Sequence, residues 1–241
     1  SGGQAGSGGL LMRWGKKDRS EPQVVKVAPS GLSYEKYECD RCVGAWYAGE
    51  RWFNNPFPGI FAKLDSQQRA YFDGLPSSAI DPALPPGTIR NGGRVKSAPY
   101  SFGGLDFVIG GSMDALINFD DGTVGIVDYK SSTASATLGE AYMPQLAAYR
   151  WALENPAEGE PKKVSVAGLL VFSPTAMVDT DQGRANLLST TWIPVDIEPD
   201  WILHKFARLA PLIHDPRAGA VKEGCGVCQI RSEMKWRWRV C

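Results

Sequence analysis

The sequence predicts an α/β fold in which a mixed central β-sheet is flanked by helices, and three observations support this class. The chain has 241 residues, 43% of them hydrophobic and 22% charged, so it can bury a sizeable core and is not disordered in bulk. Helical periodicity in the first third gives way near the middle to two strands joined by a turn. A helix, two apolar runs and another helix follow, and this mixture is typical of α/β proteins.

The domain organisation follows from changes in composition along the chain. Residues 1–22 open with a Gly- and Ser-rich run and are expected to form a flexible linker. Residues 23–241 are expected to form a single domain, with a core at about 99–215. Cysteine-bearing segments at about 33–50 and 222–241 lie on either side of that core.

The expected elements follow from local patterns. Ser33 is a candidate helix cap, and apolar residues at helical spacing predict a helix over residues 61–72. Residues 74–98 are rich in Pro, Gly and Ser and are expected to form a long connection. The remaining expected elements are strands at 107–109, 113–119 and 124–129, a helix within 136–154, strands at 164–172 and 190–197, and a helix at 201–213.

Charge and hydropathy exclude some classes of function. The 26 basic and 26 acidic residues cancel, so any contact with nucleic acid must come from a local patch. Trp236 and Arg237 lie in a run of alternating cations and aromatics, which suits stacking on bases; packing of this terminal run on a metal site is an equal alternative. No apolar run is long enough to span a bilayer, so we expect a cytoplasmic protein without membrane contact.

Two acids and a lysine lie on the two central strands. Strand alternation puts Asp128 and Lys130 on one face, and a three- or five-residue connection centred on Asp121 would place Asp114 opposite Asp128. A two-residue turn would put the two acids on opposite faces. Paired carboxylates suit Mg²⁺ or Mn²⁺, which can activate water, and a lysine beside them can offset negative charge. The alternative is a surface hairpin with solvated charges.

The helix after these strands adds two candidates. Gln145 and Tyr149 are four residues apart and therefore share one helix face, which can pack across the same end of the sheet. Taken alone, each has an ordinary interpretation, a polar helix position for Gln145 and a core aromatic for Tyr149.

Three motifs in order carry a resemblance to a known family. They are Gly-x-x-Asp ending at Asp114, Asp-Tyr-Lys ending at Lys130, and Gln-x-x-x-Tyr ending at Tyr149. Over residues 105–155 this set resembles the RecB-like branch of the PD-(D/E)XK nucleases, which includes recombination nucleases and CRISPR-associated single-strand nucleases. The resemblance implies a restriction-endonuclease-like core.

The resemblance also implies roles for individual residues. Asp114, Asp128 and the Tyr129 carbonyl would hold Mg²⁺ or Mn²⁺, Lys130 would be the catalytic lysine, and Gln145 and Tyr149 would border the site and contact nucleic acid. The family also carries an upstream acid or histidine on a helix. Both histidines here lie downstream, and the upstream acids without motif support are Glu35, Glu38, Asp65 and Asp106.

Two Cys-x-x-Cys pairs, Cys39 with Cys42 and Cys225 with Cys228, lie near the two ends of the chain. Four thiolates can hold Zn²⁺ or an iron–sulfur cluster and so tie the ends together; the alternative is a set of unrelated buried cysteines. In some RecB-like nucleases one cysteine before the core and three after it bind a [4Fe-4S] cluster. Here Met234 stands at the expected last position. The resemblance slightly favours the cluster, with zinc as the alternative.

The sequence therefore predicts a metal-dependent nuclease that hydrolyses DNA phosphodiester bonds through Mg²⁺-activated water. The resemblance implies action on single-stranded DNA or DNA ends and membership of a larger recombination, repair or CRISPR-adaptation complex. Two alternatives stay open at this point. One is a catalytically inactive nuclease fold that binds DNA or protein, and the other is a zinc-stabilised interaction domain.

Overall fold

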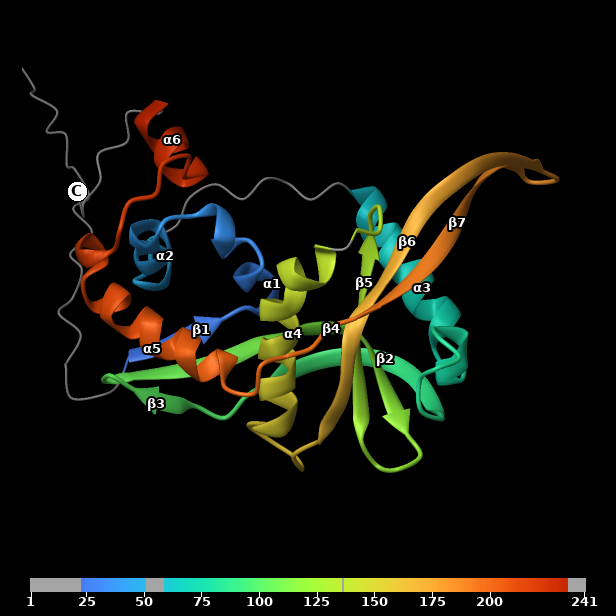
Figure 1. Cartoon of the computed structure of the whole chain (residues 1–241), viewed down its shortest axis with the longest axis horizontal. Helices are drawn as coiled ribbons and strands as arrows, with labels where there is room; N and C mark the ends of the chain where they lie inside the picture. The colour runs from blue at the N-terminus through green and yellow to red at the C-terminus, as the bar shows by residue number, and fades with distance from the viewer. Residues whose placement is uncertain (1–22, 51–58, 136, 234–241) are drawn as a thin grey trace, which may run out of the picture.

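A computed structural model describes residues 23–50, 59–135 and 137–233 of the chain (Figure 1). The predicted linker at 1–22 lies outside the described residues, as do Trp236 and Arg237. No helix in the described ranges is long and apolar enough to cross a membrane.

The described residues contain a mixed sheet of seven strands, which confirms the predicted fold class. Its main path runs β1-β4-β5-β6-β7, and β2 and β3 also pair with β4. The β1–β4 and β5–β6 pairs are parallel, whereas the other pairs are antiparallel. The strands are β1 (Gln23–Val27), β2 (Gly87–Lys96), β3 (Tyr100–Phe102), β4 (Leu105–Phe119), β5 (Val124–Ser131), β6 (Val164–Thr180) and β7 (Gly183–Pro194).

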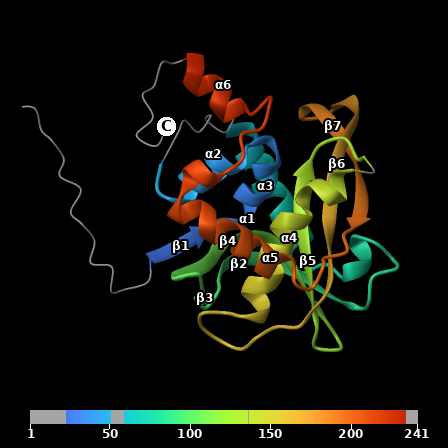
Figure 2. The same ribbon diagram turned by 60° about the vertical axis from the view of Figure 1, so that its left-hand side comes forward.

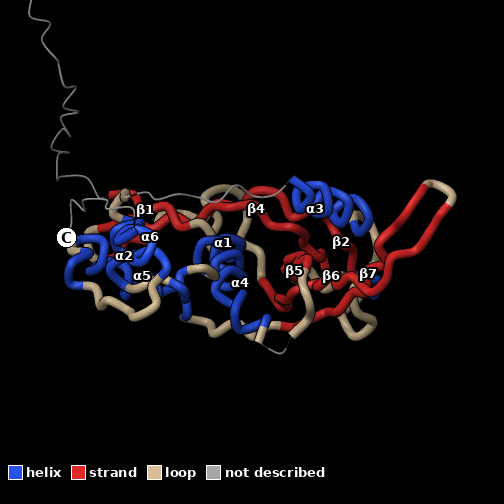
Figure 3. The backbone as a smooth tube through the Cα atoms, turned by 90° about the horizontal axis from the view of Figure 1, so that it is seen from above, coloured by secondary structure: helices blue, strands red, loops and turns tan. Residues whose placement is uncertain are grey.

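Helices cover both faces of this sheet (Figure 3). Leu116 and Ile126 pack against one helix, α4, whereas their strand neighbours Ile117 and Val127 pack toward Phe72 of α3 on the opposite face. The α-helices are α1 (Pro29–Leu32), α2 (Asp40–Tyr47), α3 (Gly59–Phe72), α4 (Leu138–Glu154), α5 (Trp201–His214) and α6 (Gly226–Glu233), and the 3-10 helices are η1 (Glu35–Tyr37), η2 (Ser77–Ala79) and η3 (Pro216–Ala218).

The two ends of the described chain meet beside the sheet. A third core cluster joins β1 and the first part of β4 to α5, with Phe107 and Phe206 stacked at 4.5 Å between ring centroids. Both Figure 1 and Figure 2 place α6 next to α2, so the C-terminal helix lies on the N-terminal part of the fold.

Several sequence-based expectations for secondary structure were wrong. The connection over residues 74–98 contains the ten-residue strand β2, which has one buried residue, Ile89, and therefore no apolar alternation to reveal it. Ser33 is the C-cap of α1 and not an N-cap. β6 and β7 run past the expected strand ends as a two-stranded arm (Figure 1), whose exposed residues likewise carry no buried-strand pattern.

Candidate active site and cysteine cluster

The turn between β4 and β5 sets the register of the two acids. It is the longer connection centred on Asp121: the Phe119 N–H donates to the Thr123 carbonyl at 3.0 Å, and Gly122 adopts a φ of 82°. Within this ladder Ala115 pairs with Val127 and Asn118 with Val124, and the same register extended by one residue places Asp114 opposite Asp128. The two carboxyl groups lie close enough that the charge of Asp128 acts on Asp114 and raises its pKa. The structure therefore brings the predicted acid pair together on one face.

The strand β4 is continuous, but its pairing is incomplete at Asp114. The β2–β4 ladder pairs Gly93 with Met113 and Asn91 with Ala115, and among the described residues Asp114 has no strand partner. Successive carbonyls of a regular strand point in opposite directions, yet the carbonyls of Met113 and Asp114 accept hydrogen bonds from one group. That group is the guanidinium of Arg69, so a side chain from α3 binds the β4 backbone where the strand pairing is incomplete.

Arg69 also contacts two carboxylates. Its Nη1 donates to the carbonyls of Met113 at 2.7 Å and Asp114 at 2.9 Å, and its Nε donates to Asp65 Oδ2 at 2.9 Å. Its Nη2 forms an ion pair with Asp114 Oδ1. The other oxygen, Oδ2, accepts from the Tyr129 N–H at 2.7 Å. Sequence reasoning missed Arg69, because nothing in the α3 pattern distinguishes it from an arginine in an ordinary i,i+4 pair.

Asp128 is 2% exposed and is held by two predicted site residues. Its Oδ1 accepts from Gln145 Nε2 at 2.6 Å, and its Oδ2 lies 2.5 Å from Lys130 Nζ. The ammonium group of Lys130 also lies 4.2 Å from the ring centroid of Tyr142, a second contact that the sequence did not indicate. The structure therefore joins Asp128, Lys130 and Gln145 in one network.

Gln145 and Tyr149 face the sheet from α4 and are both buried. The Tyr149 hydroxyl donates to the Ser112 carbonyl at 2.6 Å. A Cβ atom added at Gly111 would lie 2.9 Å from Pro29 and 3.6 Å from the Tyr149 ring, which explains the glycine of the Gly-x-x-Asp motif. Both α4 residues thus position the acid-bearing strands, and their contact with nucleic acid stays a prediction.

The alternation of β5 determines which part of Tyr129 can face the acids. Its ring lies on the α3 face, in contact with Phe72 and Phe172 at centroid distances of 5.8 and 5.7 Å. Its neighbours Asp128 and Lys130 point to the other face. Only the backbone of Tyr129 is therefore available beside the acid pair.

Burial and mutual repulsion alter the proton affinity of these groups. Burial, followed by the charge of Asp128, raises the pKa of Asp114 to about 7, against the opposing effects of the Tyr129 N–H and Arg69. Burial also raises the pKa of Asp128, although Lys130 opposes the shift. For Lys130 burial acts to lower the pKa, but the Asp128 charge and hydrogen bond outweigh it, so the pKa is raised and the ammonium group stays protonated.

The four upstream acids have different surroundings. Asp65 is linked to the acid pair through Arg69. Glu35 accepts a hydrogen bond from Tyr47 at 2.8 Å and pairs with a lysine of α5, and Asp106 accepts from a serine hydroxyl at 2.5 Å. Glu35 and Glu38 line two cavities of about 410 and 480 Å³ beside α2. Of these four, Asp65 is the one that shares a contact, through Arg69, with the acid pair in the described residues.

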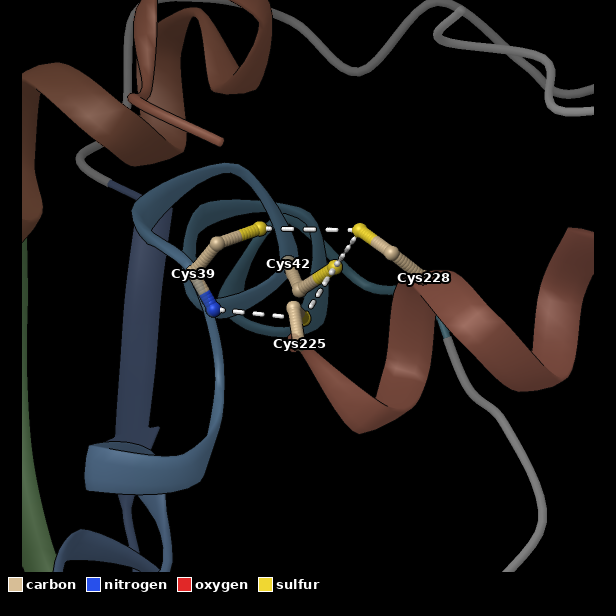
Figure 4. A group of neighbouring side chains, drawn as sticks. All are labelled: Cys39, Cys42, Cys225 and Cys228. Carbon is tan, nitrogen blue, oxygen red and sulfur yellow. Dashed lines mark hydrogen bonds between the residues drawn. The ribbon is translucent and has the colours of Figure 1, made fainter. Parts of the chain in front are cut away.

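The four cysteines of the Cys-x-x-Cys pairs meet between α2 and α6 (Figure 4). Their sulfur atoms all lie within 4.8 Å of one another. The separations are 3.7 Å for Cys39–Cys228, 3.5 Å for Cys42–Cys228 and 3.8 Å for Cys42–Cys225, and the Cys39 N–H donates to the Cys225 sulfur at 3.4 Å. The predicted joining of the two ends of the chain at four cysteines is confirmed.

Crowding alters the ionisation of these thiols. Burial, reinforced by hydrogen bonds that the Cys42 S–H donates to the neighbouring sulfurs, raises the pKa of Cys42 far above its usual range. Burial raises the pKa of Cys228 to about 11, whereas the hydrogen bonds that Cys225 receives lower its pKa against the effect of burial. Four thiolates this close together require a cation to offset their charge, which is the chemistry of a structural metal site.

Comparison with known proteins identifies a family for the chain. A family model described as the PD-(D/E)XK nuclease superfamily matches residues 35–232, a span that includes the acid pair, Lys130, α4 and all four clustered cysteines. A solved structure described as "Crystal structure of SSO0001" is similar at 14% identity and a TM-score of 0.44, covering 80% of this chain and 75% of that one. No curated protein sequence gives a significant match. The extent of the family match shows that the chain belongs to the PD-(D/E)XK nuclease superfamily.

Proposed function

We propose that this protein is a Mg²⁺- or Mn²⁺-dependent deoxyribonuclease that hydrolyses phosphodiester bonds in single-stranded DNA or at DNA ends. The single observation that carries the proposal is the convergence of Asp114, Asp128 and Lys130 on one face of the β4–β5 hairpin. The RecB-like assignment and the choice of DNA over RNA are parts of the same proposal, supported by the three ordered motifs.

The residues present fit a divalent cation. Asp128 Oδ2 is buried and ion-paired with Lys130, but no directed hydrogen bond reaches it from the described residues. The pKa values of both carboxyl groups are raised although Arg69 and Lys130 lie beside them, so a further positive charge would help both to ionise. We assign Asp114, Asp128 and the Tyr129 carbonyl as ligands, an oxygen set that Mg²⁺ and Mn²⁺ prefer. A bound ion would supply a nucleophilic water and charge stabilisation at the phosphate.

Gln145 and Lys130 would hold the Asp128 carboxylate in position, and Lys130 would also supply a positive charge beside the ion. Gln145 fixes the Asp128 carboxylate through Oδ1, which leaves Oδ2 directed toward Lys130. The protonated ammonium of Lys130 can donate a hydrogen bond to the attacking water or to a phosphate oxygen where negative charge develops. The raised pKa of Lys130 favours this role over proton abstraction, which requires the neutral amine.

A second candidate function is a nuclease fold that binds nucleic acid or a protein partner without cleaving. One observation favours it: Arg69 pairs with Asp114, so a protein cation already neutralises a predicted metal ligand. A cleavage assay distinguishes an active nuclease from a binding module that does not cleave.

The test of the proposal is cleavage of end-labelled single-stranded DNA with Mg²⁺ or Mn²⁺. We expect the wild type to degrade the strand, and both Asp128→Ala and Lys130→Ala to abolish degradation. Arg150→Gln is a matched surface control, because Arg150 forms an i,i+4 pair with Glu154 on α4 and should not affect cleavage. A wild type that binds the strand but leaves it intact with either ion contradicts the enzyme proposal and supports the binding module.

We further propose that the four cysteines bind one Zn²⁺ ion and not a [4Fe-4S] cluster. Zinc–sulfur bonds of about 2.3 Å place the sulfurs of a tetrahedral site about 3.8 Å apart. The separations of 3.5, 3.7 and 3.8 Å agree with that edge. In a cluster each cysteine binds a different iron, so its sulfurs stand farther apart by the width of the cluster.

Metal content decides between zinc and the cluster. Elemental analysis of the protein purified without oxygen should find about one zinc per chain, with no visible absorption. Iron at several atoms per chain with a brown colour would overturn the zinc assignment and return the site to the cluster implied by the resemblance.

A further inference from the structure

Asp114, one of the two acids, already forms contacts with a protein cation, the guanidinium of Arg69. The Asp114 side chain has two partners: Oδ1 forms an ion pair with Arg69, and Oδ2 accepts a hydrogen bond from the Tyr129 N–H. The backbone carbonyl oxygen of Asp114 accepts a second hydrogen bond from Arg69. Every oxygen of Asp114 therefore has a protein partner. An ion that used Asp114 as a ligand would need an oxygen that Arg69 or the β5 backbone now holds.

Electrostatics makes the two cations competitors. Both are attracted to the same carboxylate, and a guanidinium within hydrogen-bond distance of a ligand oxygen repels a divalent ion at that oxygen. Of the two partners of the carboxylate, Arg69 is the one that can leave. The Tyr129 N–H is fixed in β5, whereas Arg69 approaches on a flexible side chain.

A second acid makes the departure of Arg69 feasible. Asp65, one turn earlier on α3, holds Arg69 Nε at 2.9 Å. A guanidinium released from Asp114 would therefore keep a counter-ion and would not be left as an unpaired charge. Asp65 side-chain atoms are 43% exposed, so this resting position lies toward solvent.

Arg69 also connects α3 to the sheet. It donates to two carbonyls of β4, and the neighbouring contacts of α3 with the sheet are a 3.3 Å hydrogen bond from Gln68 to Ser131 and the packing of Phe72. Loss of the Arg69 contacts would remove the charged part of this attachment and leave one neutral hydrogen bond and apolar packing.

We propose that Arg69 is a cation-sensitive latch, which holds Asp114 and α3 to β4 until a divalent ion takes Asp114 Oδ1. The inference rests on the proposed function in one respect, the binding of a divalent ion at the acid pair. Ion binding releases Arg69 from Asp114, leaves it paired with Asp65 alone, and loosens the attachment of α3. The latch sets the ion concentration at which the site fills.

The test measures Mn²⁺ binding to the full chain by titration calorimetry at pH 8, where Asp114 with its pKa of about 7 is ionised. Arg69→Gln removes the competing charge, so we expect Mn²⁺ to bind on the order of tenfold more tightly than in the wild type. Arg150→Gln removes an arginine of similar pairing that lies away from the acids, and it should leave the affinity unchanged. Arg69→Lys, which cannot make the four contacts at once, should bind a few-fold more tightly and serves if the glutamine variant does not fold.

Each outcome decides a part of the proposal. Equal or weaker Mn²⁺ binding in both Arg69 variants overturns the latch, and if Asp128→Asn still abolishes wild-type binding, the proposed ion site survives that failure. Absence of Mn²⁺ binding in the wild type and in both Arg69 variants overturns the latch and the proposed function together. Hydrogen exchange of residues 59–72 should rise when Mn²⁺ binds to the wild type, and unchanged exchange overturns the loosening of α3.

Discussion

The raised pKa of Asp114 predicts that the metal-free protein loses stability as the pH rises. The folded-state pKa is about 7 against an ordinary value of 3.8. Below about pH 4 the carboxyl group is protonated in both states. Between about pH 4 and pH 7 the folded state keeps a proton that the unfolded state releases, so the free energy of unfolding falls as the pH rises, and the loss is complete just above pH 7.

The size of the effect follows from the shift. A difference of about three pKa units corresponds to about 4 kcal/mol at most, since one unit is worth ~1.4 kcal/mol. Asp114→Asn cannot ionise and removes this contribution. The assay is urea unfolding of both proteins in metal-depleted buffer from pH 4.5 to 8, compared as the difference between the two profiles, which cancels the titrating groups that do not interact with Asp114 and reports Asp114 together with its effect on Asp128. Parallel profiles for the wild type and Asp114→Asn would refute the assignment of a buried, charge-repelled carboxyl group.

Three further predictions test the other parts of the site. Lys130→Gln should reduce cleavage on the order of 10²- to 10⁴-fold without weakening Mn²⁺ binding. The reason is that the ammonium group acts on the reacting phosphate or water and does not bind the ion. Weaker Mn²⁺ binding in this variant would contradict this role. Gln145→Ala leaves the buried Asp128 Oδ1 without its hydrogen-bond donor, so it should weaken Mn²⁺ binding roughly 10- to 100-fold in calorimetry. An unchanged affinity would show that Gln145 does not position Asp128 as a ligand. Cys42→Ser should abolish stoichiometric zinc and lower the thermal midpoint, whereas Cys241→Ser should retain the zinc; equal metal content in both would place the metal elsewhere.

The sequence was informative where local spacing determines which residues come together. Strand alternation and a turn centred on Asp121 were enough to pair Asp114 with Asp128, and a four-residue spacing brought Gln145 to the same site. The Cys-x-x-Cys spacing likewise predicted that the two ends of the chain meet. These inferences succeeded because strand and helix geometry fix side-chain direction over a few residues.

The sequence did not predict features whose position depends on contacts between residues far apart in the chain. Arg69 reaches Asp114 from 45 positions upstream, and its pattern on α3 matches that of any surface arginine beside Asp65. Half of the residues of β2 are exposed and one is buried, and the strand is held by hydrogen bonds to β4, so it leaves no hydrophobic signature. The same reason hid the β6–β7 arm, in which apolar residues such as Met177 face outward.

The location of Mn²⁺ in crystals of the full chain tests the central claim most directly. The account predicts an anomalous scattering peak bound by the carboxylates of Asp114 and Asp128 and by the Tyr129 carbonyl, with Arg69 released from Asp114 and paired with Asp65 alone. A peak at the acid pair with Arg69 still on Oδ1 would retain the metal site and remove the latch. The absence of Mn²⁺ from the acid pair at saturating concentration would contradict the account.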